Sequence, residues 1–243
     1  MSFLAPEQLD ELIRFALFAD REARSDLAKS FIKDENDYTS NFTGALRRII
    51  NSNSECGLSA TSFLIPHSDE RQIGGDAAII LTRGGESKVS IFEGKWPRFR
   101  KPGYAWDYYQ TAEQNLSHFS DQLERQKRWK KIFAVFEMFY CEYPLGRQPP
   151  FLERDGSSCV WHNDAAEFNL TRPHPNGLWT QDELKTLLQA KRVSISDVMK
   201  DFGICDKGEP IRSVKPMDIG REYHLPQRLL AIKARRGRIE PPG

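Results

Sequence analysis

The N-terminal part of the chain carries apolar residues at helical spacing. From position 6 to about position 32 they recur every three or four residues, which predicts one long helix or two helices in succession. Pro6 suits the first position of such a helix, because its missing N–H would have no partner there. The polar run 34–37 interrupts the pattern, and a second helix is expected from about 38 to 51.

Strand-like apolar runs follow these helices. The run 58–66 predicts a first core strand, and the runs 74–81 and 88–96 predict two more. The last two are joined through Gly84-Gly85, a preferred two-residue turn of β-hairpins. We therefore expect these two strands to pair antiparallel.

Helix and strand patterns alternate further along the chain. A stripe of apolar residues that includes Tyr109, Phe119 and Leu123 predicts a helix from about 107 to 131. The segment 131–142 alternates two apolar faces and predicts a central strand buried on both sides. The remaining expectations are a loop over 144–156, edge strands within 158–170, a helix that opens with a capping box at Thr180 and runs to about 191, and a helix from Ser194 or Ser196 through Phe202.

Composition and charge limit the classes of protein to consider. The 243 residues are 39% hydrophobic and 28% charged, which suits one domain, or one domain with a small appendage. The expected division is a helical segment over 1–34, a core over 35–143 and a C-terminal extension over 144–243 packed on that core. The net charge of +1 gives no global attraction to nucleic acid, so a binding surface must come from local clustering. We expect a cytoplasmic protein without a membrane segment, and the four scattered cysteines argue against a zinc site or a disulfide framework.

The predicted hairpin brings three charged residues together. The numbers of facing residues across the Gly84-Gly85 turn add up to 169, so Asp76 faces Glu93. Facing residues on antiparallel strands share a side of the sheet, as do residues two apart on one strand, and Lys95 therefore projects with both acids. A slip of one residue in the register would scatter the three.

This arrangement favours a metal site. Two facing carboxylates repel, and each raises the pKa of the other unless a cation lies between them. Carboxylate oxygens suit a hard ion such as Mg²⁺, with Mn²⁺ as the second candidate, and substrate phosphate oxygens typically complete its shell. The Gly94 carbonyl could join that shell. The Lys95 ammonium could orient a metal-bound water and stabilise charge that develops on the phosphate.

The Glu-x-Lys motif is common by itself and occurs three times, at 86–88, 93–95 and 183–185. The first lies beside the turn, where charges are normally solvated, and the third sits in a helical pattern as a surface pair. Only the middle one has an acid placed opposite by a turn and apolar neighbours that would bury its strand. Burying an unpaired Glu and Lys costs folding free energy. The alternative is a salt bridge at the hairpin end, which would explain Glu93 and Lys95 but not Asp76.

The pattern Asp-x16-Glu-x-Lys on a hairpin resembles that of the PD-(D/E)xK nuclease superfamily, which includes restriction endonucleases, Holliday-junction resolvases and many phage-defence nucleases. The resemblance covers about 35–140 and implies that Asp76 and Glu93 are metal ligands and that Lys95 is the catalytic lysine. Gly75 stands where the motif has its proline, a departure that many members share. The resemblance also implies an α/β fold: a central mixed β-sheet flanked by helices, with a restriction-endonuclease-like αβββαβ core and helical N-terminal and C-terminal additions.

Further site residues follow from the same resemblance. A helix before the first core strand often contributes another acid to the metal site, and Glu35 is the nearest candidate, with Asp37 next. The alternative is that Asp37 or Thr39 caps the helix and that Glu35 is solvated. Many relatives place a glutamine on the helix after Glu-x-Lys to hold the metal-bound water or a phosphate, which points to Gln122 and Gln126. Either could instead be an ordinary helix-edge amide.

Cationic side chains after the hairpin are candidates for contacts with phosphates. Arg98, Arg100 and Lys101 lie among aromatic residues, whose rings could stack on exposed bases or form a lid over the sheet edge. Arg125 and Arg128 make the end of the following helix basic, which complements the helix dipole and could also reach a phosphate backbone, although such runs are usually solvated. The last two helices could form a helix-turn-helix module, but more often such a pair packs on the core. The basic tail 233–238 suits phosphate contact or disorder.

The combined expectation is a Mg²⁺-dependent endonuclease that hydrolyses phosphodiester bonds of nucleic acid, with double-stranded DNA as the first candidate substrate. The resemblance and the lack of other domains suggest phage defence or restriction. A chain of this size suggests a homo-oligomer, or a partner protein that delivers or gates the DNA. The alternatives are an inactive nuclease-like binding module, a ribonuclease or toxin with the same site, and a structural subunit whose basic surfaces bind acidic proteins.

Overall fold

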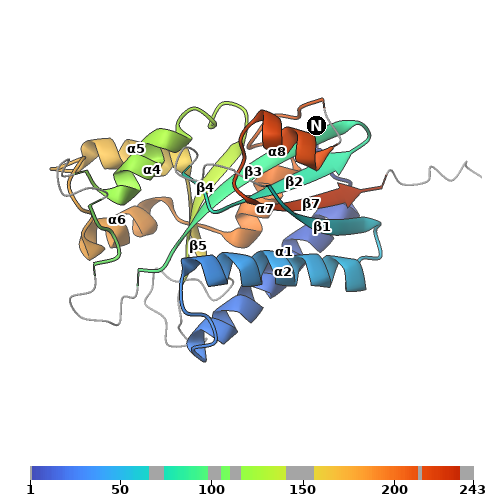
Figure 1. Cartoon of the computed structure of the whole chain (residues 1–243), viewed down its shortest axis with the longest axis horizontal. Helices are drawn as coiled ribbons and strands as arrows, with labels where there is room; N and C mark the ends of the chain where they lie inside the picture. The colour runs from blue at the N-terminus through green and yellow to red at the C-terminus, as the bar shows by residue number, and fades with distance from the viewer. Residues whose placement is uncertain are drawn as a thin grey trace, which may run out of the picture.

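The computed structural model describes residues 2–65, 74–97, 105–109, 116–140, 156–212 and 215–235. In these ranges the chain forms a seven-stranded mixed sheet flanked by helices (Figure 1), which confirms the predicted α/β class. The strands are β1 (Leu58–Leu64), β2 (Ala77–Arg83), β3 (Glu86–Lys95), β4 (Ala134–Phe139), β5 (Ser158–Trp161), β6 (Val193–Ser194) and β7 (Arg228–Ala234), in the spatial order β1-β7-β2-β3-β4-β5-β6. The helices are α1 (Pro6–Ala28), α2 (Glu35–Asn53), α4 (His118–Gln126), α5 (His162–Thr171), α6 (Gln181–Lys191), α7 (Ile195–Gly203) and α8 (Pro216–Glu222).

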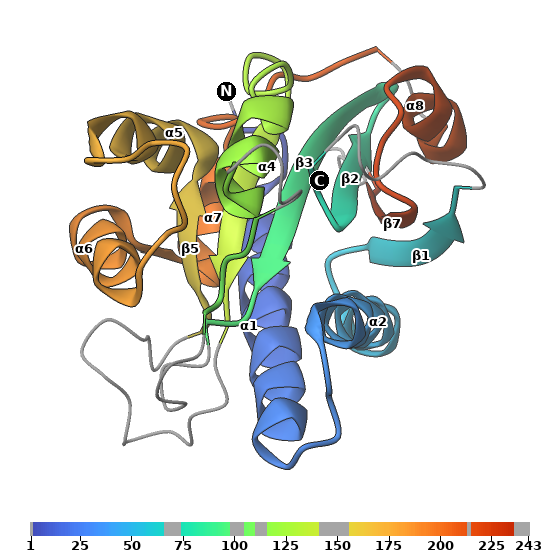
Figure 2. The same ribbon diagram turned by 60° about the vertical axis from the view of Figure 1, so that its left-hand side comes forward.

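The helices cover both faces of the sheet and bury its apolar side chains. α1, α2 and α7 pack on the face that carries Ile79, Phe92 and Phe136. The opposite face carries Ile80 and Ile91 and is covered by α8 at the β7 end, while α4, α5 and α6 gather at the β5 end (Figures 1 and 2). None of the helices in the described ranges combines the length and apolarity needed to cross a membrane.

The hairpin predicted around Gly84-Gly85 is confirmed. Ala77 lies opposite Phe92, which is the predicted register in which facing residue numbers add up to 169. Both glycines have positive φ, +62° and +98°, as the two central positions of a type I′ turn require. Both strands are buried along most of their length, so a slip in register would move apolar side chains to the wrong face.

The central strand predicted within 131–142 is also confirmed. β4 lies between β3 and β5, and all six of its side chains are buried. Phe136 packs on the face covered by α1 and α2, while Val135 and Phe139 pack on the opposite face. A strand with helices on both faces has to be apolar on both sides.

β7 occupies a place for which the sequence predicted no element. It pairs antiparallel with β1 and parallel with β2, so it separates the first strand from the hairpin. Its apolar run 229–232 is buried. The C-terminal segment therefore supplies β5, β6 and β7 of the sheet, and β1 lies at the sheet edge.

The long helix predicted from about 107 to 131 is wrong at its N-terminal side. Of the described residues in this range only α4 is helical, and the Ser117 side chain caps its first turn by accepting a hydrogen bond from the Ser120 N–H. Asp107 is not in a helix: its carboxylate accepts from the Ser117 hydroxyl and from the main-chain N–H groups of Phe119 and Trp179. Tyr109, which the helical stripe placed inward, is 43% exposed.

A second correction concerns the edge strands predicted within 158–170. The first four residues form β5, but the chain then turns into α5 at His162. The predicted loop over 144–156 lies outside the described residues except for Gly156.

α6 begins at the capping box predicted at Thr180, and α7 begins after Ser194, one of the two serines considered for its start. Both pack on the core: α6 packs on β5 and α5 and buries Leu187, and α7 packs on α1 and buries Phe202.

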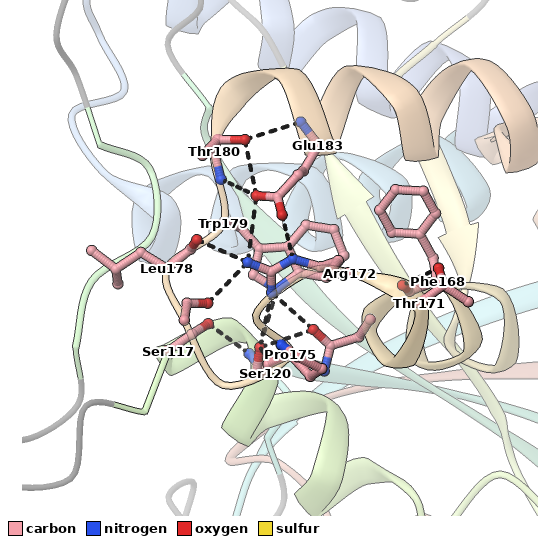
Figure 3. A network of polar contacts seen from close by, with 12 residues as sticks. Ser117, Ser120, Phe168, Thr171, Arg172, Pro175, Leu178, Trp179, Thr180 and Glu183 are labelled. Carbon is pink, nitrogen blue, oxygen red and sulfur yellow. Dashed lines mark hydrogen bonds and ion pairs between the residues drawn. The ribbon is translucent and has the colours of Figure 1, made fainter.

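One buried side chain, Arg172, joins the helices at the β5 end of the sheet (Figure 3). Its guanidinium pairs with Glu183 of α6 at 2.9 Å and lies over the Trp179 ring. It also donates to Asn169 and to the carbonyls of residues 177 and 178. Because every side of the guanidinium has a partner, this buried charge is structural.

Candidate active site

The three charged residues predicted to converge lie at the end of the hairpin opposite its turn. Asp76 precedes β2 by one residue, and its N–H donates to the Phe92 carbonyl at 2.9 Å. Its carboxylate accepts from the Gly94 N–H at 2.8 Å, so it is held against the end of β3. Glu93 and Lys95 project from the same strand, and the Lys95 ammonium lies 2.7 Å from Glu93 Oε1.

The charges in this cluster perturb one another strongly. Glu93 and Lys95 are each only 4% exposed. Burial, and then the charge of Glu93, raise the pKa of Asp76 well above its usual value, and the opposing effects of Lys95 and of the Gly94 N–H only partly offset them. Burial alone would lower the pKa of Lys95, but the charges of Glu93, Glu35 and Asp76 outweigh it and raise that pKa. Lys95 therefore stays charged near pH 7 among these three acids.

Gly94 is the point where the main chain enters the cluster. A Cβ at this position would lie 3.2 Å from Thr39 Oγ1 and 3.3 Å from Asp76 Oδ2, so a larger residue would press on both. The N–H and C=O of one residue point to the same side of a strand, so the Gly94 carbonyl faces the Asp76 side together with its N–H. This is the orientation that the predicted role of Gly94 as a ligand requires.

Of the two acids considered on the first turn of α2, Glu35 reaches the cluster and Asp37 does not. Glu35 Oε1 accepts from the Trp96 N–H at 3.0 Å, and its charge acts on both Asp76 and Lys95. Asp37 is exposed and accepts from the Lys33 N–H. The predicted capping by Asp37 or Thr39 is wrong, because the N-cap is Asp34, whose side chain accepts from the Asp37 N–H at 2.8 Å.

Gln122 and Gln126 lie one turn apart on α4 and both point into the sheet, where they are buried. The Gln122 amide donates to Glu93 Oε1. The Gln126 amide donates to the Gly74 carbonyl, just before Asp76. The two glutamines therefore bind both sides of the hairpin end, and the alternative of helix-edge amides is wrong.

Two further residues of this cluster were not identified from the sequence. Glu137 of β4 lies directly beside Glu93 in the parallel pair and is fully buried, and burial followed by the charge of Glu93 raises its pKa. Gln126 links Glu137, at 3.4 Å, to His162 Nδ1, at 3.0 Å. Burial lowers the pKa of His162 to about 4, so the ring is neutral near pH 7. A lone acid within an apolar alternation could have indicated Glu137, whereas no sequence signal indicates His162.

The candidate phosphate-binding cations are only partly described. Arg98, Arg100 and Lys101 lie outside the described residues. Arg125 forms an ion pair with Asp121 on α4 at 2.8 Å, and the exposed Arg128 lies over the Trp129 ring, 4.6 Å from its centroid.

The other two Glu-x-Lys motifs have separate explanations. Glu86 is exposed beside the turn, but the expectation of a solvated partner is wrong, because Lys88 is fully buried. Its ammonium donates to the carbonyl of Phe202 in α7 at 2.5 Å and to the carbonyl of Lys207, beyond that helix, at 3.0 Å. Glu183 binds Arg172, and Lys185 pairs with Asp182 on the surface.

Neither the residue geometry nor the comparisons assign this cluster to a known class of site. Within the described ranges, no group of three or more His, Cys, Asp or Glu side chains is placed to hold a metal ion. Searches of protein-family models, of curated proteins and of solved structures found no match to this chain.

Proposed function

We propose that this protein is a Mg²⁺-dependent nuclease of the PD-(D/E)xK superfamily, with the restriction-endonuclease-like core formed by α2, β1, β2, β3, α4 and β4. The observation that carries the proposal is the convergence of Asp76, Glu93 and Lys95 at the end of one hairpin. Burial and then the charge of Glu93 raise the pKa of Asp76, and the acids around Lys95 raise its pKa against burial. A salt bridge between Glu93 and Lys95 alone would leave Asp76 as a costly buried acid.

The donor chemistry of the cluster suits a hard cation. Asp76 and Glu93 offer carboxylate oxygens, and the Gly94 carbonyl faces the same side, so these three would hold Mg²⁺ or Mn²⁺. Water and substrate phosphate oxygens commonly complete the shell of Mg²⁺. Glu35 is a further candidate ligand, although its carboxylate already accepts from the Trp96 N–H. A bound Mg²⁺ would supply Lewis acidity and a water of lowered pKa.

The chain's own residues would position the reactants. The raised pKa of Lys95 excludes it as a proton acceptor near neutral pH, so its ammonium would orient the attacking water and stabilise charge on the phosphate. The water oxygen forms a bond to phosphorus, the bond to the leaving oxygen breaks, the water loses its proton to solvent and the leaving oxygen gains one. Gln122 holds Glu93 in place through its amide.

The biological setting rests on the resemblance and on the sequence, and not on the geometry of the site. We propose DNA as the first substrate class, restriction or phage defence as the role, a cytoplasmic location, and either a homo-oligomer or a partner protein that delivers or gates the DNA.

The decisive experiment is a cleavage assay with the full chain. Labelled duplex DNA, single-stranded DNA and RNA would be incubated side by side with Mg²⁺, with Mn²⁺ and with EDTA. We expect metal-dependent hydrolysis that falls by about 100-fold or more when a site residue is replaced. The site variants are Asp76→Asn, Glu93→Gln and Lys95→Met.

Matched controls come from residues of the same type outside the site. Glu86→Gln lies on the same strand, and Asp182→Asn and Lys185→Met remove an exposed pair on α6. These variants should retain activity. Hydrolysis that survives Glu93→Gln, or that needs no divalent ion, would refute the proposed site. Hydrolysis of RNA alone would identify the ribonuclease alternative, and binding without hydrolysis would identify the binding module.

A further inference from the structure

An aromatic pair, of which the tyrosine is exposed, lies near the candidate active site. The Tyr108 ring is 57% exposed and stacks on the His118 ring, with centroids 4.4 Å apart and planes inclined by 15°. Only one face of the tyrosine is occupied by this stack. Burial, followed by the charges of Lys95 and Arg125, lowers the pKa of His118 to about 3, so its ring is uncharged near pH 7.

The pair is held rigidly, although Tyr108 lies outside regular secondary structure. The His118 N–H donates to the Tyr108 carbonyl at 2.8 Å, and Tyr109 forms a β-bridge with Ser117. Asp107, one residue before the tyrosine, accepts three hydrogen bonds at the start of α4. Trp106 anchors the segment in the core. An exposed ring with so many main-chain restraints loses little further entropy when it binds a ligand.

The ring lies near the site, because His118, on which it stacks, is one helical turn before Gln122 on α4, and the Gln122 amide donates to Glu93. Burial raises the pKa of Tyr108, and the charges of Lys95, Glu35 and Glu93 all act on it. Tyr108 therefore lies near the residues that would hold the scissile phosphate.

We propose that Tyr108, backed by His118, is a stacking platform for an unpaired nucleobase next to the scissile phosphate. This inference rests on the proposed nuclease function and narrows its substrate class to DNA that is single-stranded, or has an unpaired nucleotide, at the cleavage point. Within a duplex both faces of a base are already covered by neighbouring base pairs, so a base must be unstacked before it can lie on Tyr108. Among the described rings of the aromatic segment considered from the sequence, Trp106 is buried and Trp96 stacks on Tyr140.

Binding measured without hydrolysis tests the platform. The full chain in EDTA would be titrated into a fluorescein-labelled DNA strand of about 16 nucleotides, its duplex, and an RNA strand of the same sequence, with anisotropy as the signal. Tyr108→Ala should weaken binding of the DNA strand about tenfold, the effect of losing one base–aromatic stack, and should change duplex binding less than about twofold. Tyr108→Phe should bind like the wild type, because the phenylalanine ring retains the stack.

A matched control and a positional readout complete the test. Phe18 is 48% exposed on α1, which packs against α2 and α7, and Phe18→Ala should leave strand binding unchanged. A strand that carries 5-iododeoxyuridine should crosslink to Tyr108 under ultraviolet light. Equal weakening of strand and duplex by Tyr108→Ala, or strand binding that it leaves unchanged, would overturn the platform. RNA binding with the same dependence on Tyr108, in place of DNA binding, would overturn the DNA assignment.

The outcomes separate this inference from the proposed function. Metal-dependent cleavage with no role for Tyr108 refutes the platform and leaves the nuclease. Strand binding that depends on Tyr108, with no cleavage under any metal, supports the platform and refutes the nuclease.

Discussion

Replacing Asp76 with asparagine should stabilise the metal-free protein. Asparagine keeps an oxygen that can accept the Gly94 N–H and has nearly the shape of aspartate. The substitution removes the charge. It leaves the ion pair between Glu93 and Lys95, 2.7 Å apart, without a second acid beside it. A gain in stability on removal of a buried functional charge is the trade-off expected at an active site.

The magnitude follows from the balance of charges around Asp76. Two unit charges about 4 Å apart interact by about 4 kcal/mol at an effective dielectric constant of about 20. For Asp76, the attraction of Lys95 and the hydrogen bond from the Gly94 N–H oppose the repulsion from Glu93. The net cost of the charge at Asp76 therefore comes mainly from the burial of its carboxylate. We expect a net gain of roughly 1–2 kcal/mol in the free energy of unfolding, or about 2–8 °C in Tm for a chain of this length.

The assay is thermal and urea unfolding of both proteins in EDTA across a range of pH. The pKa of Asp76 is raised in the folded state, so the wild type loses stability as pH rises from the usual value of 3.8 through the raised value. The difference between the variant and the wild type should therefore be small at acidic pH and should grow towards neutral pH. Asp182→Asn, at an exposed pair, should change stability by less than about 0.5 kcal/mol at either pH.

Mg²⁺ provides the complementary measurement. A cation that neutralises the two acids should raise the Tm of the wild type. At a Mg²⁺ concentration of 100 times the Kd, the stabilisation is about 2.7 kcal/mol, and Asp76→Asn should gain far less. An Asp76→Asn variant that is less stable than the wild type at neutral pH would show that Asp76 is a satisfied structural acid. The electrostatic argument for the site would then fail.

Three other substitutions test the parts of the fold that position the site. Arg172→Lys should cost about 3 kcal/mol in urea unfolding, because an ammonium cannot replace a buried, multiply bonded guanidinium, and a loss below about 1 kcal/mol would contradict the role given to that network. Tyr38→Phe removes a hydroxyl that bonds buried Asp20 and Ser157, and should cost about 1–3 kcal/mol at unchanged circular dichroism, whereas an unchanged denaturation midpoint would show that the bonds contribute nothing. Gly85→Ala places a side chain at φ +98° and should lower stability by about 1 kcal/mol, and a stabilised variant would contradict the turn geometry.

The hairpin was predictable from sequence because everything that defines it is local. Two apolar runs and a Gly-Gly turn fix the register, and the register alone places Asp76 beside Glu93 and Lys95. The capping box at Thr180 was predictable for the same reason, since it is complete within four residues.

The errors arise where distant segments decide the structure. β7 pairs with β1 and β2 across more than half of the chain, and nothing in its own apolar run indicates which strands it joins. The start of α4 depends on Asp107, which accepts from the Phe119 N–H. Asp107 also accepts from the N–H of Trp179, a residue far away in the sequence. The helical spacing of Tyr109 carried no information about these bonds. Likewise, His162 enters the candidate site only because α5 folds back against α4.

Two buried polar networks in this protein differ in whether their hydrogen bonds are saturated. Around Arg172 every N–H of the guanidinium is directed at an acceptor, and the opposite charge of Glu183 balances it (Figure 3). The candidate site has three acids, Asp76, Glu93 and Glu137, beside the ammonium of Lys95. Within the described part of the chain, Gln122 Oε1 and Glu137 Oε1 have no hydrogen-bond partner. Buried acceptors without donors cost stability, and folds retain such conflicts mainly at functional sites. This contrast is the physical reason to look for a ligand at the hairpin end and to treat Arg172 as part of the scaffold.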